Sequence, residues 1–253
     1  MIADIMDRSV QRQSPEDEGY MVKISQRWLK VGALTLMLGA SGQAFSAAKV
    51  SEGDPWEGFN RATYRFNDTV DAWVLKPVAQ GYDTVTPEPI QDVVSNFFRN
   101  LSEFRNIANS LLQFRLKEAG ESAGRLVVNS TVGMLGMLDV ASGMGLDYHY
   151  QDFGLTLAQW NVPSGPYVVV PLLGPRTVRS AAGIYPDMQA SPITHIHDSR
   201  DQLITQTSDL VSLRASLLKQ ELLIVGDEYT FVRDAYLQRR DFLITGELPE
   251  DDF

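Results

Sequence analysis

Residues 153–175 constrain the fold of this chain most strongly, and they read FGLTLAQWNVPSGPYVVVPLLGP. The run from Leu155 to Pro175 carries no charged residue, and an uncharged run of that length ordinarily indicates a membrane span. Three internal prolines argue against a span, because each removes a backbone donor and clashes with the preceding turn. Irregular backbone survives at membrane depth only where protein or a cavity surrounds it. The sequence therefore predicts an apolar loop or short strand held inside a scaffold.

A second uncharged stretch lies upstream, where residues 126–138 read LVVNSTVGMLGML. It is too short to cross a bilayer but long enough to lie within one leaflet. Its glycines allow close backbone packing, and its methionines adapt to irregular apolar partners. Two interpretations stay open: both stretches are buried core, or both contact lipid.

Amphipathic patterns predict helices on both sides of these stretches. Asp54-Pro55-Trp56-Glu57 combines a capping aspartate, a proline in the first turn and an acid near the positive end of the helix dipole. A helix is expected to begin there and to end at Lys76-Pro77. Its core-facing stripe is expected to consist of Trp56, Phe59, Thr63, Phe66, Val70 and Trp73.

Further helices follow the same spacing. Two short ones are expected in succession, the first around residues 93–101 and the second from Ser102. The second is expected to face inward with Phe104, Ile107, Ala108, Leu111 and Leu112. Others are expected over residues 117–128, 176–184, 201–224 and 228–244, the last closing at Gly246 with Phe231, Val232, Ala235, Phe242 and Leu243 inward. With a pair of very short strands around residues 167–170, the predicted class is all-α.

Four segments are expected along the chain. Residues 1–20 are polar and patternless, and they are interpreted as an over-extended start, with translation beginning at Met21. Residues 21–46 combine a basic region, an apolar core and small residues, which is typical of a secretory signal peptide. The alternative is an amphipathic anchor that the mature protein retains. Residues 47–246 are expected to form one helical domain, and residues 247–253 an acidic tail.

The composition excludes several classes of partner and of chemistry. The net charge of −10 disfavours nucleic acid and anionic membrane surfaces as general partners. The chain has no cysteine, which excludes disulfides, thiol catalysis, cysteine metal sites and lipid attachment through cysteine.

The sequence offers little support for catalysis. His195, His197 and Asp198 could supply metal ligands, but no further ligand lies within sequence reach. His149 is isolated in an Asp-Tyr-His-Tyr loop. No hydrolase elbow, zinc-protease motif or phosphate loop occurs. We expect no catalytic residues, no metal and no cofactor.

Five blocks of sequence resemble the MlaA (VacJ) family, in order and over nearly the whole chain after the signal. They are DPWEGFNRATYRFND (54–68), VLKPVAQGYDTVTPEPIQDVVSNFFRNLSE (74–103), NSTVGMLGMLDVAS (129–142), DFGLTLAQWNVPSGPYVVVPLLGPRTVR (152–179) and YTFVRDAYLQRRDF (229–242).

The resemblance implies a ring-shaped, all-helical protein on the periplasmic side of the Gram-negative outer membrane, seated in its inner leaflet, with an amphipathic central passage. It implies removal of phospholipid from the outer leaflet, delivery to a soluble periplasmic MlaC-like carrier and association with a trimeric porin. It implies no catalysis. Members of the family typically carry a cysteine at the end of the signal, whereas this chain reads GASGQAFSAAK there. An apolar belt is therefore expected to supply more of the anchoring.

The passage is assigned to apolar and glycine residues of the two uncharged stretches. They are Val132, Gly133, Met134, Leu135, Gly136, Met137, Leu138, Leu155, Leu157, Trp160, Tyr167, Val169 and Leu172. Plain core packing is the alternative for each. Asn60 and Arg61 are assigned to the headgroup side, with a solvated helix face and helix-to-loop hydrogen bonds as the alternative. Two rival functions remain: a soluble periplasmic lipid carrier, and a periplasmic lipid hydrolase that would depend on the histidines.

Overall fold

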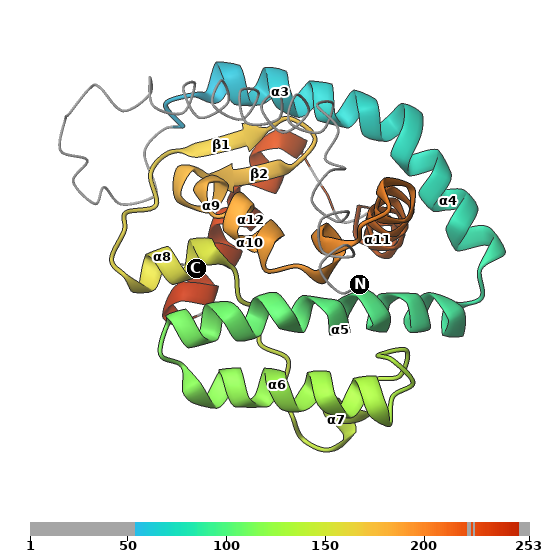
Figure 1. Cartoon of the computed structure of the whole chain (residues 1–253). Coiled ribbons are helices and arrows are strands. Elements are labelled where there is room, and N and C mark those ends of the chain that lie inside the picture. Colours follow the sequence, from blue (N-terminus) through green and yellow to red (C-terminus); the bar gives the residue numbers. More distant parts are fainter. Residues whose placement is uncertain (1–53, 222–223, 225, 248–253) are drawn as a thin grey trace, which may run out of the picture. The chain divides into compact units, whose positions relative to one another are not determined.

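The computed structural model describes residues 54–221, 224 and 226–247 (Figure 1). All of them belong to one compact unit, Lys49–Phe253. Three expectations fall outside the described residues: the over-extended start (1–20), the signal peptide (21–46) and the acidic tail beyond Glu247.

Helices dominate the described unit, which confirms the all-α class (Figure 1). In chain order the elements are α3 (Glu57–Val70), the π-helix η1 (Asp71–Leu75), α4 (Lys76–Val85), α5 (Glu88–Leu112), α6 (Leu116–Thr131), α7 (Val140–Gly143), α8 (Phe153–Gln159), β1 (Tyr167–Val170), β2 (Gly174–Thr177), α9 (Val178–Ala182), α10 (Ile184–Gln189), the 3₁₀-helix η2 (Pro192–His195), α11 (Ser199–Glu221) and α12 (Glu228–Thr245). Among these helices, none combines the length and apolar character needed to cross a bilayer.

Several predicted boundaries are confirmed. The short strands form an antiparallel hairpin in which Tyr167 pairs with Thr177 and Val170 pairs with Gly174. The last helix closes at Gly246, whose φ of 76° is the left-handed conformation that glycine adopts without a steric cost. The helix predicted from Arg176 starts later, because residues 174–177 form the second strand of the hairpin.

Two predicted helix boundaries are wrong. The first helix does not end at Lys76-Pro77, because a π-turn precedes the proline and the chain continues into α4. Such a turn absorbs the interruption that a missing N–H causes. The two helices predicted on either side of Ser102 are one helix, α5. The Ser102 hydroxyl donates to the carbonyl of Arg99 within that helix, at 2.7 Å, instead of capping a new one.

The helices turn polar faces inward, so the predicted inward faces are largely wrong; Thr63, a member of the predicted stripe, is buried as expected. On α3 the buried residues are Asn60 and Thr63, whereas Phe59 is 58% exposed; Trp73, on η1, is 81% exposed. On α5 the buried residues are Asn100, Glu103, Asn106, Asn109 and Ser110, whereas Phe104, Leu111 and Leu112 are exposed. On α12, Phe231, Ala235 and Phe242 are exposed while Tyr229 and Arg240 are buried.

Arg125 of α6 occupies the centre of one polar interior region. Its side chain and that of Glu103 on α5 are each 1% exposed, and their Nε–Oε1 distance is 2.8 Å. The other guanidinium nitrogens donate to both oxygens of Asp139 (3.0 Å), to Ser142 Oγ (2.9 Å) and to the carbonyl of Leu146 (2.6 Å). These bonds join α5, α6 and the segment around α7. In Figure 1, α5 and α6 run alongside each other.

A second polar region joins α5, α8, α10 and α12. Asp152 caps the N-terminus of α8 by accepting from the Leu155 N–H at 2.8 Å, and it forms a buried ion pair with Arg240. Asp187 of α10 accepts from the Phe153 N–H at 2.9 Å and from Asn109 Nδ2 at 3.0 Å. Burial, with the charge of Asp152 second, raises the pKa of Asp187 to about 6.

Replacing Arg125 by methionine is expected to lower the free energy of unfolding by about 3–5 kcal/mol, because the carboxylates of Glu103 and Asp139 would stay buried without their cation. The matched control is Arg99→Met, since Arg99 is 4.0 Å from Asp139 but largely exposed. Chemical unfolding of the full chain, followed by circular dichroism, measures both. Equal losses in the two variants would contradict the role given to the buried network.

The stability of the chain is expected to depend on pH through Asp187. Because its folded pKa lies above the unfolded value of about 3.9, the folded state holds the proton more tightly between pH 4 and 6, and this contribution to stability is lost as the pH rises. From pH 4 to pH 7 the wild-type chain is therefore expected to lose about 2–3 kcal/mol relative to Asp187→Asn. Unfolding curves at both pH values test this, and a constant difference between the chains would refute it.

Candidate functional site

Residues 132–138 form an exposed apolar loop that follows α6. Met134, Leu135 and Gly136 have φ values of 55°, 61° and 89°, so three successive residues are left-handed. Non-glycine residues in this region cost about 1–3 kcal/mol each and persist only where the surroundings fix them. The loop directs five apolar side chains outward: Val132, Met134, Leu135, Met137 and Leu138.

Backbone contacts hold this loop in place. The Gly136 N–H donates to the Asn129 carbonyl at 2.7 Å, and the Leu138 N–H donates to the Gly133 carbonyl at 2.9 Å. A Cβ added at Gly133 would lie 2.3 Å from the Leu138 carbonyl oxygen, and one added at Gly136 would lie 2.6 Å from the Asn100 side chain. Both glycines are therefore required by the turn itself.

The β1–β2 hairpin presents a second exposed apolar loop, with Leu172 at a φ of 62°. Two asparagines of α3 hold the hairpin, and they are seven residues apart, on one face of the helix. The Asn60 amide donates to the Tyr167 carbonyl (3.0 Å) and accepts from the Val169 N–H (2.8 Å). The Asn67 amide donates to the Val170 carbonyl (3.1 Å) and accepts from the Leu172 N–H (2.8 Å). Each side chain thus bonds the hairpin backbone as a neighbouring strand would.

A third exposed apolar loop follows α8. Trp160 is about half-exposed, and its Nε1 donates to the Leu112 carbonyl at 3.2 Å. Its ring meets Phe153 edge to face at 6.0 Å. Asn161 follows with a left-handed φ of 59°, which turns the chain toward residues 162–166.

The structure divides the thirteen predicted passage residues by exposure. The exposed ones are Val132, Met134, Leu135, Met137, Leu138, Trp160 and Leu172; Leu157 is half-buried; Gly133, Gly136, Leu155, Tyr167 and Val169 are buried. Tyr167 and Val169 pack with Tyr229 of α12 in one core cluster. The passage assignment as a whole stays a prediction.

The two residues assigned to the headgroup side both make extensive contacts within the protein. Asn60 is fully buried in the hairpin contact. Arg61 pairs with Glu57 at 2.7 Å and with Asp227 at 2.6 Å, and its guanidinium lies 4.4 Å from the ring centroid of Tyr229. The bond from Arg61 is the main cause that lowers the pKa of Asp227 to about 2. Their headgroup role also stays a prediction.

Two of the three histidines form hydrogen bonds with other residues of the protein. His149 bonds Glu121 of α6 through Nε2, which lowers the pKa of that carboxyl. His195 bonds the Ser191 carbonyl through Nδ1 at 3.0 Å. In the described part of the chain, no three acidic or histidine side chains gather as a metal site would require.

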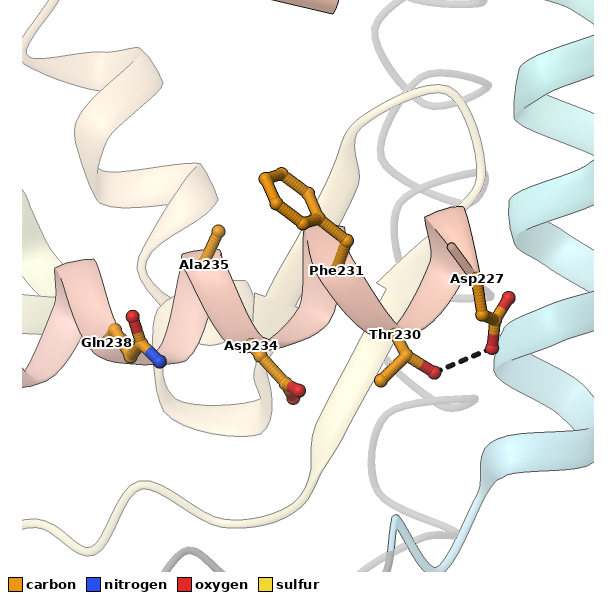
Figure 2. A pocket seen from close by; sticks show the side chains of 6 residues that line it. All are labelled: Asp227, Thr230, Phe231, Asp234, Ala235 and Gln238. Carbon is orange, nitrogen blue, oxygen red and sulfur yellow. Dashed lines mark hydrogen bonds between the residues drawn. The ribbon is translucent and has the colours of Figure 1, made fainter. Parts of the chain in front are cut away.

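A shallow, open hollow runs along α12, lined by Asp227, Thr230, Phe231, Asp234, Ala235 and Gln238 (Figure 2). In Figure 2, Phe231 and Asp234 point to different sides of the helix, so these side chains do not converge on one enclosed site. Its two carboxylates make it unsuited to an anionic ligand.

Sequence reasoning missed Asn67, which holds the hairpin, and the side chains that connect α5, α6 and the segment around α7: Asn100, Arg125 and Asn129. One signal was available, because α5 carries polar residues at helical spacing from Asn100 through Glu103, Asn106, Asn109 and Gln113. This stripe resembles a solvated face, but it is the buried face of the helix.

Comparisons with known proteins agree with one another. The family model described as "MlaA lipoprotein" matches residues 52–243. The "Intermembrane phospholipid transport system lipoprotein MlaA" of Escherichia coli is 32% identical over 218 residues, which cover 84% of this chain and 86% of that protein. An uncharacterized protein of Rickettsia prowazekii is 37% identical over 142 residues, and the match spans 56% of this chain and about half (54%) of that relative.

A solved structure described as "Structural basis for maintenance of bacterial outer membrane lipid asymmetry" matches with a TM-score of 0.67 at 32% identity. The match covers 77% of this chain and 100% of that chain. Helical class, fold and sequence lead to the same assignment: this chain belongs to the MlaA lipoprotein family.

Proposed function

We propose that this chain is a phospholipid transport component that maintains the lipid asymmetry of the outer membrane. It removes phospholipid from the outer leaflet and passes it to a soluble periplasmic MlaC-like carrier. The names of the relatives and of the matching structure support transport and asymmetry. The observation that carries the proposal is the distribution of polarity: exposed apolar loops are fixed by a buried polar interior.

This distribution suits a protein whose surroundings are partly lipid. In water, exposed apolar side chains such as those of Leu135 and Leu172 would forgo about 25 cal/mol for each Å² that could be buried. In contact with acyl chains that loss disappears. Contiguous exposed apolar surface on a soluble protein generally marks a partner or a membrane.

The proposed seat is the inner leaflet of the outer membrane, on the periplasmic side. Exposed aromatic and aliphatic side chains would lie among acyl chains there, with Trp73 and Trp160 suited to the interface by their ring N–H groups. A trimeric outer-membrane porin is the proposed protein partner. The porin and the carrier are inferred from the family resemblance.

The lipid path is proposed along the exposed members of the predicted passage. They are Val132, Met134, Leu135, Met137, Leu138, Trp160 and Leu172. Three turns with left-handed residues fix the loops that carry them, so these side chains keep their positions when a lipid moves past. Movement down a gradient of lipid chemical potential needs no energy source within this chain.

Deleting the gene is expected to raise surface-exposed phospholipid. Acylation of lipid A by an outer-membrane enzyme and sensitivity to detergent with chelator both report it. Complementation with the full chain and with a form that starts at Met21 should restore the wild-type values. An unchanged level of surface phospholipid, with the protein recovered from the soluble periplasm, would replace the proposal by the soluble carrier.

Leu135→Lys is expected to reduce complementation at normal protein abundance, because a cation at this exposed tip would be placed among acyl chains. Leu135→Met is the matched control, since it keeps an apolar side chain at the same left-handed position. The two variants are compared by detergent sensitivity and by immunoblot of membrane fractions. Full complementation by Leu135→Lys would exclude this loop from the path.

A further inference from the structure

Most of the cationic side chains in the described part of the chain have an acidic partner. Among the described residues, every lysine has a carboxylate oxygen within 4.0 Å, and so do Arg61, Arg99, Arg115, Arg125, Arg214, Arg233 and Arg240. Three half-buried arginines form no such pair within the described part of the chain: Arg105 of α5, Arg176 of β2 and Arg179 of α9. Of these three, only Arg179 has a buried donor nitrogen without a hydrogen-bond partner among the described residues.

The first turn of α9 holds Arg179 against the loop that follows α8. The Arg179 N–H donates to the Ser164 carbonyl at 3.0 Å, and the neighbouring Val178 N–H donates to the Pro166 carbonyl at 3.0 Å. The guanidinium donates from Nη1 to the Val162 carbonyl at 2.7 Å. One edge of this cation is thus fixed on the loop backbone.

The Nε of Arg179 is buried, and it has no hydrogen-bond partner among the described residues. A buried donor without an acceptor is unfavourable, so such a group calls for an explanation. Burial lowers the pKa of Arg179, and the nearby charge of Arg240 lowers it further. An anionic oxygen at the half-exposed guanidinium would offset both effects on its charge.

The surroundings of this cation are apolar. Trp160 and Val162 lie on the loop that Arg179 holds, Val178 precedes it in the chain, and all three are exposed. A fixed, half-exposed guanidinium without an acidic partner, bordered by exposed apolar side chains, matches an anion that carries hydrocarbon. A planar guanidinium also suits the paired oxygens of a phosphate.

We propose that Arg179 binds the phosphate of a phospholipid headgroup, with the acyl chains on the apolar rim of Trp160, Val162 and Val178. This subsite deepens the proposed transport function and rests on it. It replaces Arg61 as the headgroup contact, since the guanidinium of Arg61 is held between two carboxylates. A purely structural Arg179, which only holds the loop through Val162, is the rival explanation.

The test is a binding experiment on the full chain, purified in maltoside detergent. Three probes are compared: dihexanoyl phosphatidylethanolamine, dihexanoylglycerol without the phosphate, and inorganic phosphate. The wild-type chain is expected to prefer the phospholipid over the uncharged diacylglycerol. Arg179→Gln should reduce this preference by about ten- to a hundredfold.

The matched control is Arg200→Gln, which removes the same charge from an exposed arginine of α11 and should keep the preference. An unchanged preference in Arg179→Gln overturns the proposal. If the affinity for both lipids falls equally and the unfolding temperature is lower, Arg179 only stabilises the loop, and the proposal is overturned. Inorganic phosphate binding as tightly as the phospholipid would identify a site for the free anion, which also overturns it.

If Arg179→Gln does not fold, the Arg179→Lys variant is used to test the subsite instead. It keeps the charge but loses the planar pair of donors, so the phosphate preference should fall several-fold while diacylglycerol binding is unchanged. A preference equal to wild type would refute the site.

The proposed function can fail independently of this subsite. Wild-type protein that does not restore asymmetry in the deletion strain refutes the transport function. Arg179→Gln that restores asymmetry as fully as wild type refutes only the subsite.

Discussion

The buried guanidinium of Arg125 is the constraint on which the arrangement of α5, α6 and the following loop depends. A charge removed from water destabilises a fold by several kcal/mol unless partners compensate it. Here Glu103 and Asp139 supply opposite charge, and a hydroxyl and a carbonyl take the remaining donors. Because these acceptors come from two helices and from the segment after α6, the elements must meet in one geometry.

Side-chain amides extend this constraint to the loops. Asn60 and Asn67 bond the hairpin backbone from α3, and Asn100 and Asn129 surround the turn at Gly136. Hydrogen bonds are directional, whereas apolar contacts are not, so an interior built from amides can hold loops in conformations that are unfavourable by themselves. The left-handed residue Leu172 is held in this way by Asn67, whereas Met134 and Leu135 are held by the backbone bonds of their own turn; all three side chains lie outward.

The polar interior and the apolar exterior together would suit this unit to the amphipathic ligand of the proposed function. The acyl part of a lipid would require apolar surface that does not rearrange, and the exposed loops would provide it in the proposed path. The phosphate requires a cation that is not already neutralised, and most of the arginines are committed to carboxylates in the fold. The loop beside Arg179 supplies only a neutral carbonyl, so its charge would be available to the proposed phosphate.

The sequence by itself determined the all-α class, the hairpin at Tyr167–Val170 and the helix stop at Gly246, because prolines, glycines and 3.6-residue spacing act locally. It also determined the family, because five motifs occur in order. Only the tertiary structure decided which face of each helix is buried. Periodicity identifies two faces, such as that of Phe59 and Phe66 beside that of Asn60 and Asn67. The rule that apolar residues lie inside assumes that water surrounds the protein. Where buried amides and ion pairs hold the helices together, the polar face turns inward, and this depends on partners far away in the sequence.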